Sequence, residues 1–318
     1  NYDPCRGTGI SVRIVNGTVK TGDQILFMSN GADYRVEELG IFRLRREPQQ
    51  QLAAGEVGYI IAGVKTVSDT RPGDTITLRD RPAATPLPGF KEVQQVVFSS
   101  LYPVSTDDYE DLASALEKLK LNDAALTFQK DSSAALGFGF RCGFLGLLHL
   151  EVVQERLERE FDISLILTVP TVKYHFYLQN QTLVEVDNPS YFPDPGSIAR
   201  VEEPFIKATI HIPERYMGVV MTLCMERRGE NIKYHYPMPG RIEFICELPL
   251  AEVIYDFYDK LKSVTQGYGS FDYELIDYRP SDLIKLDILV NGEQVDALSQ
   301  LVHRARARER GLKACESL

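Results

Sequence analysis

The sequence predicts a multidomain α+β protein in which a small closed β-barrel precedes two ferredoxin-like βαββαβ domains. Short apolar strands separated by glycine turns, with no convincing helical period between them, fill residues 1–88. One order of strand and helix periods then occurs twice, over residues 93–169 and again over 205–278. A chain of 318 residues is long enough for two or three domains.

The barrel is predicted from its turns. Asn16-Gly17 follows an apolar strand and is the strongest short signal for a β-hairpin. Other glycine turns precede the apolar runs at residues 59–62 and 75–78. Residues 82–89 contain three prolines and a glycine, so we predict a linker there and end the first domain at residue 88.

The second domain is assigned to residues 89–180. After a strand at 96–98, Thr106-Asp107-Asp108 supplies the oxygen-bearing side chains that favour a helix start. Apolar residues follow first at helical spacing, then in two alternating strands, a second apolar helix stripe and a last strand at 163–169. This order is that of a four-stranded antiparallel sheet with two helices on one face.

The third domain, residues 205–280, repeats that order. Its second helix is predicted from one stripe formed by Ile254, Phe257, Tyr258 and Leu261. The stretch before it is rich in proline, so residues 181–204 are predicted to be an extended connector. Residues 281–318 would begin a further domain.

Composition and charge limit the possible functions. Thirty-five Lys and Arg against 45 Asp and Glu give a net charge of −10. That balance is poor for a protein whose whole surface grips nucleic acid, because phosphates must be neutralised by local positive charge. The five cysteines include no CxxC pair, so neither a zinc site nor a disulfide framework is predicted. A reduced, intracellular, soluble protein without a bound metal is expected.

No pattern in the chain predicts catalysis. The phosphate-binding sequence G-x-x-x-x-G-K-S/T does not occur, and the glycines of residues 137–143 fit close packing of a strand better than a nucleotide loop. His149 and Glu151 could form an acid–base or metal pair, but two residues apart on a helix they point about 200° away from each other. We therefore predict that Gly143, Gly146, His149 and Glu151 are structural or relay residues, with no catalytic or cofactor-binding residue in this chain.

The strongest positive charge lies in the eleven residues that begin at His303. They contain five Lys and Arg and one Glu, a local net charge of +4. Because Arg304, Arg306, Arg308 and Arg310 occur at every second residue, they would spread around a helix, which suits contact with a curved phosphate surface. The five named residues are the candidates for RNA or ribosome contact. The alternative is a solvated helical face with Arg–Glu pairs.

Several segments together resemble the LepA family of translational GTPases, also called elongation factor 4. Residues 143–151, continuing to residue 161, are similar to the family's form of a segment found across ribosomal elongation GTPases. Residues 136–142 favour LepA over elongation factor G. Further similar landmarks are Asn122-Asp123, residues 247–252, 295–298 and 302–304, and, in a barrel of the translation-factor type, Asn16-Gly17, Gly22-Asp23, residues 55–58 and residues 63–65.

The resemblance implies a larger intact protein. A GTPase domain that binds GTP with Mg would precede the barrel and is absent from this sequence, so the fragment itself is not expected to be an enzyme. A LepA-specific C-terminal domain would start at residue 281. The intact protein would bind the ribosome, contact ribosomal RNA and tRNA, hydrolyse GTP, and promote back-translocation or accurate, efficient protein synthesis. A monomer is expected in the cytoplasm, with peripheral association at the inner face of the cell membrane; an organellar source stays open.

Two other classes of function compete with this interpretation. A nucleotide-independent RNA-binding adaptor built on ferredoxin-like sheets would need exposed aromatic residues on strands flanked by Lys or Arg, whereas Tyr234-His235-Tyr236 is isolated. A metabolic enzyme with a regulatory βαββαβ pair would need a pocket of convergent titratable residues, and the sequence indicates none.

Overall fold

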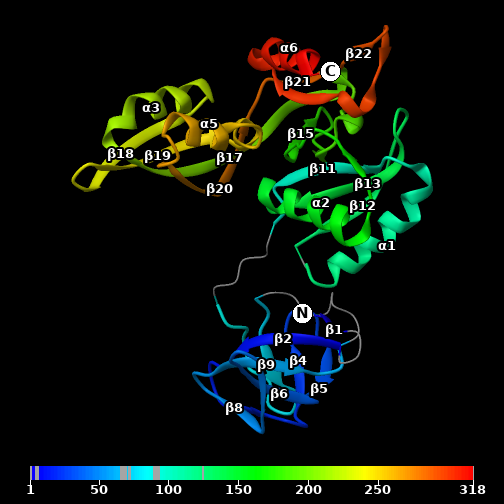
Figure 1. Cartoon of the computed structure of the whole chain (residues 1–318), viewed down its shortest axis with the longest axis vertical. Helices are drawn as coiled ribbons and strands as arrows, with labels where there is room; N and C mark the ends of the chain where they lie inside the picture. The colour runs from blue at the N-terminus through cyan, green and yellow to red at the C-terminus, as the bar shows by residue number, and fades with distance from the viewer. Residues whose placement is uncertain are drawn as a thin grey trace. The chain divides into compact units, whose positions relative to one another are not determined.

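The computed structural model describes residues 2–3, 7–64, 70, 73–88, 94–123 and 125–317 (Figure 1). The chain divides into two compact units. One contains residues 1–94 and 113–127, and the other contains residues 95–112 and 128–318. The far end of the predicted linker, residue 89, lies outside the described residues, as does Cys5.

The first unit contains the predicted barrel strands, arranged in three small sheets. The largest has the order β1-β2-β9-β6-β7, and the other two are β10-β4-β5 and β3-β8. Their apolar side chains share one core, which includes the fully buried Leu39 and Leu52. The strands are β1 (Tyr2–Asp3), β2 (Gly7–Arg13), β3 (Thr18–Lys20), β4 (Gln24–Phe27), β5 (Asp33–Arg35), β6 (Glu38–Phe42), β7 (Arg46–Gln49), β8 (Gln51–Ala53), β9 (Val57–Ile61) and β10 (Ile76–Leu78).

The Asn16-Gly17 turn is present, but it does not close a hairpin. Gly17 has φ +75°, as a tight turn requires. However, β2 pairs with β1 and β9, whereas β3 pairs with β8. The turn lies against the 53–56 loop, where Gly55 N–H donates to the Ile14 carbonyl at 2.8 Å. The hairpin prediction was wrong because a local turn signal does not determine which strand the next segment pairs with.

The first ferredoxin-like domain follows the predicted order. Its elements are β11 (Val97–Pro103), α1 (Tyr109–Lys120), β12 (Thr127–Ser133), β13 (Gly137–Phe144), α2 (Leu147–Phe161) and β14 (Leu165–Leu167). The sheet order is β12-β13-β11-β14, with β11 antiparallel to both of its neighbours. The predicted start at 106–108 forms a 3-10 turn that leads directly into α1.

The second ferredoxin-like domain repeats this topology. Its elements are β17 (Ile198–Pro213), α3 (Met217–Glu226), β18 (Glu230–Met238), β19 (Arg241–Pro249), α4 (Leu250–Val253), α5 (Phe257–Val264) and β20 (Ser270–Pro280). The four core strands have the order β18-β19-β17-β20, the same permutation as in the first domain. The prediction of a single second helix was wrong, because residues 254–256 separate α4 from α5. At this break the side chains of Tyr255 and Asp256 contact arginines outside the helix, which an apolar stripe does not reveal.

The prediction of an extended connector over residues 181–204 was also wrong. β15 (Tyr174–Leu178) and β16 (Leu183–Val186) form a hairpin that joins the edge of the second sheet through β17. Tyr174 and Phe176 alternate toward the core, which explains the strand. Pro189 and Pro195 occupy the first positions of two short 3-10 turns, η3 (Pro189–Tyr191) and η4 (Pro195–Ser197), where proline is tolerated.

The C-terminal segment begins with two small hairpins. β21 (Leu283–Leu286) pairs with β24 (Gln300–His303), and β22 (Leu289–Val290) pairs with β23 (Glu293–Gln294). The 3-10 turn η6 (Asp296–Leu298) connects β23 to β24. A further turn, η7 (Arg304–Arg306), leads into α6 (Ala307–Ser317). Within the described part of the chain, no helix has the length and apolar character needed to cross a bilayer.

Candidate functional site

His149 lies at the start of α2, where its side chain contacts the residues just before the helix. The Leu145 N–H donates a hydrogen bond to His149 Nδ1 at 3.0 Å, and the imidazole packs edge-on against the Phe144 ring. Glu151 is exposed beyond the first turn of α2, which contains no acidic residue. The two side chains are therefore not brought together, in agreement with the predicted geometry.

The glycines of this region differ in how much space surrounds them. A Cβ at Gly139 would lie 2.5 Å from the Leu101 carbonyl oxygen of the neighbouring strand, and a Cβ at Gly146 would lie 3.3 Å from the Tyr273 hydroxyl. Gly143 is buried in β13 opposite Phe98. Close backbone approach accounts for Gly139, and no contact of these glycines indicates a phosphate cradle.

The C-terminal arginines fall into two groups with different surroundings. Arg306 and Arg310 lie near Glu252, at 3.9 Å and 3.7 Å from its Oε2 atom. Arg304 is exposed and pairs with the exposed carboxylate of Asp282 at 2.8 Å. Arg308 is exposed, and no ion pair or hydrogen bond involves its side chain within the described residues.

Helical geometry explains this division. Residues four apart lie on the same face of a helix, whereas residues two apart lie on nearly opposite faces. Arg306 and Arg310 therefore face α4 and the α4–α5 break, and Arg304 and Arg308 lie on the other side. His303 caps the turn before α6, since its Nδ1 accepts a hydrogen bond from the Ala305 N–H at 3.3 Å.

A buried charge cluster receives the inward arginines. Glu252 is 4% exposed, and its Oε1 accepts a hydrogen bond from Arg228 Nε at 3.2 Å. Arg228 also forms a bidentate pair with buried Glu203. Its Nη1 donates to Oε1 at 2.7 Å and its Nη2 donates to Oε2 at 2.9 Å. Burial lowers the pKa of Arg228, but the hydrogen bond and charge of Glu203 outweigh it, so the net shift is upward. Such bidentate pairs fix geometry as well as charge.

The neighbouring acid, Asp256, completes the cluster. It pairs with Arg227, and Lys313 Nζ of α6 lies 3.6 Å from its Oδ2. Burial raises the pKa of Asp256, whereas the positive charges of Arg227, Lys260 and Lys313 lower it, and the net shift is downward. The carboxylate is thus held ionised among cations from the residue that follows α3, from α5 and from α6.

A second buried network, which the sequence analysis missed, involves residues of β11, β12 and β13 in the first ferredoxin-like sheet. Asp131 Oδ2 accepts hydrogen bonds from Ser100 Oγ at 2.6 Å, Tyr102 OH at 3.1 Å and Asn188 Nδ2 at 3.3 Å. Arg141 is buried and donates to Ser100 Oγ at 3.1 Å. Burial lowers the pKa of Arg141, and the charges of Asp187 and Asp131 oppose that shift.

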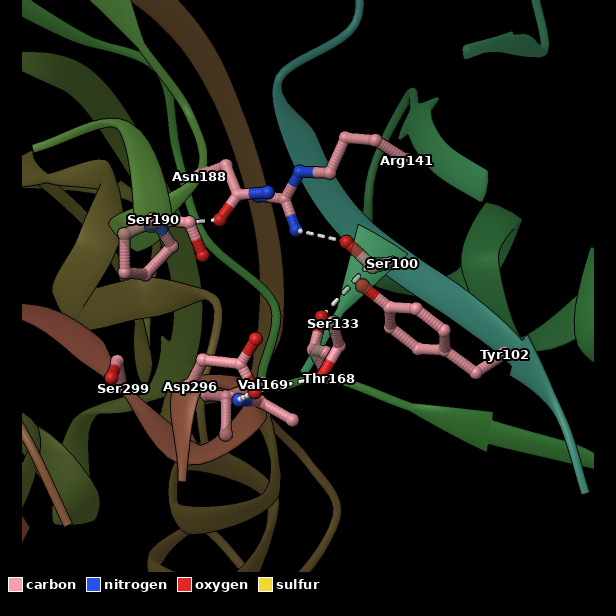
Figure 2. Close-up of a pocket in the computed structure, with 12 residues that line it drawn as sticks. Ser100, Tyr102, Ser133, Arg141, Thr168, Val169, Asn188, Ser190, Asp296 and Ser299 are labelled. Atoms are coloured by element: carbon pink, nitrogen blue, oxygen red, sulfur yellow. Dashed lines mark hydrogen bonds between the residues drawn. The ribbon is translucent and has the colours of Figure 1, made fainter. Parts of the chain in front are cut away.

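Figure 2 shows the cavity beside this network, with Arg141, Ser100 and Tyr102 on one side and Asp296 with Ser299 on another. Its volume of about 20 Å³ is enough for one water molecule. Burial and the charge of Asp131 raise the pKa of Tyr102, so its phenol stays protonated and donates. A volume of this size is too small for a nucleotide.

Asp296 ties the C-terminal segment to the β12–β13 turn. Its Oδ1 accepts from Ser133 Oγ at 2.7 Å, and its Oδ2 accepts from the Ala134 N–H at 2.8 Å. Burial raises the pKa of Asp296, but these hydrogen bonds lower the pKa by more than burial raises it. The net shift is therefore downward. The similarity of residues 295–298 to a family landmark thus corresponds to a contact between two modules.

No group of three or more His, Cys, Asp or Glu side chains is arranged to hold a metal ion in the described ranges. Cys224 and Cys246 are buried, with their sulfur atoms 3.7 Å apart. The hydrogen bond with Cys246, followed by burial, raises the pKa of Cys224. These thiols pack as apolar groups rather than as metal ligands.

Two family models match parts of the chain. Residues 7–77 match the model described as elongation factor Tu domain 2, and residues 200–289 match the model described as elongation factor G C-terminus. The first range covers the barrel and the second covers the second ferredoxin-like domain. Both matches agree with the multidomain fold described above.

Curated relatives are similar to the chain over its whole length. Proteins named elongation factor 4 are 76% identical in Desulfotalea psychrophila, 69% in Syntrophus aciditrophicus and 56% in Treponema denticola, each over 318 residues. In each case the alignment covers 100% of this chain and 53% of the relative. The chain therefore spans about half the length of the curated relatives it matches.

Proposed function

The chain belongs to the elongation factor 4 family, and from this we propose that it is the ribosome-binding part of a translational GTPase. The intact protein would bind GTP with Mg²⁺ outside the present sequence and hydrolyse it on the ribosome. Back-translocation, or support of accurate and efficient synthesis, would be the result. The proposal places the protein in the cytoplasm, where it would act as a monomer.

One observation carries the proposed role of this chain in RNA contact. On the outward side of η7 and α6, Arg308 is exposed without a partner in the described part of the chain, and Arg304 has only a solvent-exposed one. An exposed ion pair contributes about 0–1 kcal/mol, so Arg304 can exchange Asp282 for a phosphate at little cost. Ribosomal RNA or tRNA is the partner that such a pair fits within a chain of net charge −10.

The ionic-strength dependence of ribosome binding tests this proposal. In the full-length protein, Arg304→Gln with Arg308→Gln should weaken binding at low salt. The slope of log affinity against log salt should fall by about 1.4–1.8, since each phosphate contact contributes about 0.7–0.9.

The matched control is Arg156→Gln with Arg159→Gln, which removes two arginines from the surface of α2. Its slope should equal that of the wild type. An unchanged slope in the Arg304/Arg308 variant would place the RNA contact elsewhere in the protein.

The competing classes have less support. The relatives and family models do not favour a nucleotide-independent RNA adaptor, and the small cavity at the Arg141 network does not fit an enzyme active site. Nothing in the comparisons supports the peripheral membrane association that the resemblance implied.

A further inference from the structure

The arginines of the C-terminal segment alternate regularly along the sequence but differ sharply in what surrounds them. The inward pair, Arg306 and Arg310, lies against Glu252, with side chains that are 23% and 12% exposed. The outward pair, Arg304 and Arg308, is exposed to solvent. Arg306 also donates a hydrogen bond to Glu309 Oε2 at 2.6 Å. The two pairs differ because only the inward one lies against a buried carboxylate, whereas Arg304 pairs with the exposed Asp282.

Glu252 is the acceptor that the inward pair shares. Its Oε2 atom is buried and has no hydrogen-bond partner within the described residues. The guanidinium groups of Arg227, Arg306 and Arg310 lie around that atom at 3.9, 3.9 and 3.7 Å. A buried carboxylate is costly unless cations compensate it, so these three groups are held near it.

Two further contacts hold the same face of α6. The Arg310 guanidinium lies 3.5 Å from the centre of the Tyr255 ring, a cation–π distance. One turn later, Lys313 lies 3.6 Å from Asp256. Residues Tyr255 and Asp256 of the α4–α5 break therefore form the surface that α6 contacts.

We propose that Glu252 is the positioning residue of this tail. It retains Arg310 of α6 and, together with Glu309, Arg306 of η7 on the inward side, and so leaves Arg304 and Arg308 as the pair that binds RNA phosphates. This inference rests on the proposed function, because it takes RNA contact by the tail as its starting point. It follows that an arginine held by Glu252 releases no counterion from RNA and adds nothing to the salt dependence of binding.

The first experiment measures binding of the full-length protein to poly(U) RNA across a range of salt concentrations. Single-stranded RNA contributes about 0.7 to the slope for each neutralised phosphate. Replacing the outward pair, Arg304→Gln with Arg308→Gln, should lower the slope by about 1.4. Replacing the inward pair, Arg306→Gln with Arg310→Gln, should leave the slope unchanged. An equal loss of slope in both variants would overturn the inference.

The second experiment removes the acceptor instead of the arginines. Glu252→Gln releases Arg310, whereas Arg306 keeps its 2.6 Å hydrogen bond to Glu309. The slope should therefore rise by up to about 0.7, and adding Arg306→Gln with Arg310→Gln should cancel that rise. Glu160→Gln, which removes a carboxylate from a solvent-exposed pair with Arg156, is the control for the change in net charge. A purely structural role of Glu252 would not steepen the slope.

Hydrogen exchange separates failure of this inference from failure of the proposed RNA contact. Amides of residues 307–316 should exchange faster in the Glu252→Gln variant than in the wild type or in Glu160→Gln. If Glu252→Gln does not fold, the Arg306/Arg310 variant provides the same readout from the opposite partner. Unchanged exchange in α6 overturns the positioning role. Faster exchange with no slope change in the Arg304/Arg308 variant overturns the RNA contact instead.

Discussion

Asp131 lies in a strand of mostly polar sequence, Thr127–Ser133, yet it is 8% exposed and accepts three side-chain hydrogen bonds. Polar residues normally mark the solvent side of a strand, so the sequence pattern gives no sign of this burial. Only the tertiary structure brings Ser100, Tyr102 and Asn188 to the same oxygen. The complete set of partners makes the buried charge tolerable.

Two glycines should respond in opposite ways to the same substitution. Gly139→Ala should destabilise the protein by about 1–3 kcal/mol, because its Cβ would lie 2.5 Å from a backbone oxygen that cannot move freely. Gly218, in α3, has no atom within 4 Å of the added methyl group, so Gly218→Ala should stabilise the helix by up to about 1 kcal/mol. Urea denaturation of the two variants measures both changes. Equal effects would contradict the packing described for β13.

The separation of His149 from Glu151 could be predicted, because helical geometry depends only on spacing. The sorting of the arginines could not. A period of two on a helix predicts scattered positions, but it does not say that Glu252, more than fifty residues earlier, will hold half of them. Likewise, the structure contains the Asn16-Gly17 turn, but the pairing of the strands beside it depends on distant partners.

At the scale of elements, polar side chains decide where the regular structure begins and ends. Hydrophobic periods located the core helices and strands correctly, including the buried stripe Leu150, Val153 and Leu157 of α2. They failed at the α4–α5 break and at the β15–β16 hairpin. In the first case ionic contacts lie at the point where the helix is interrupted. In the second, two of the prolines that suggested a linker, Pro189 and Pro195, lie in 3-10 turns next to strands.

The contact between Asp296 and the β12–β13 turn should depend on pH. Its pKa lies below the ordinary 3.8, so the ionised form stabilises the folded state. That contribution is fully present above the unfolded pKa and is lost as the pH falls through the lower folded value. Asp296→Asn should therefore cost most stability above about pH 5 and progressively less below pH 3.8.

Urea unfolding of wild type and Asp296→Asn between pH 3 and pH 7 measures this difference. The control, Asp259→Asn, changes an exposed aspartate of α5. Its difference from the wild type should stay small at every pH. A cost of Asp296→Asn that is the same at pH 3 and pH 7 would show that the carboxylate's charge does not matter.

At the scale of the whole molecule, the two ferredoxin-like domains share one strand permutation, although little in their sequences is alike. The order of helical and strand hydrophobic periods along the sequence was sufficient to predict this repetition. Each such period specifies one helix or strand, and short connections between elements allow few topologies. The sequence contains no G-x-x-x-x-G-K-S/T phosphate-binding loop, and the cavity beside the Arg141 network has a volume of only about 20 Å³.

This chain by itself should not bind GTP. Calorimetric titration of the 318-residue protein with a non-hydrolysable GTP analogue should give only the heat of dilution. The full-length protein, titrated in the same buffer with Mg²⁺, provides the positive control. A dissociation constant in the micromolar range for the chain alone would contradict the assignment of nucleotide binding to a part outside this sequence.

The strand β17 has a mechanical consequence. Its 16 residues extend over about 50 Å and pair with β15 near one end and with β19 and β20 over the rest. A pull along the strand loads these hydrogen bonds in shear, so many must break together, whereas a pull across the sheet would open them one at a time. Tension between the β15–β16 hairpin and α3 would thus be transmitted along a single stiff segment. Such a strand should resist a force applied along its length more strongly than a force applied across the sheet.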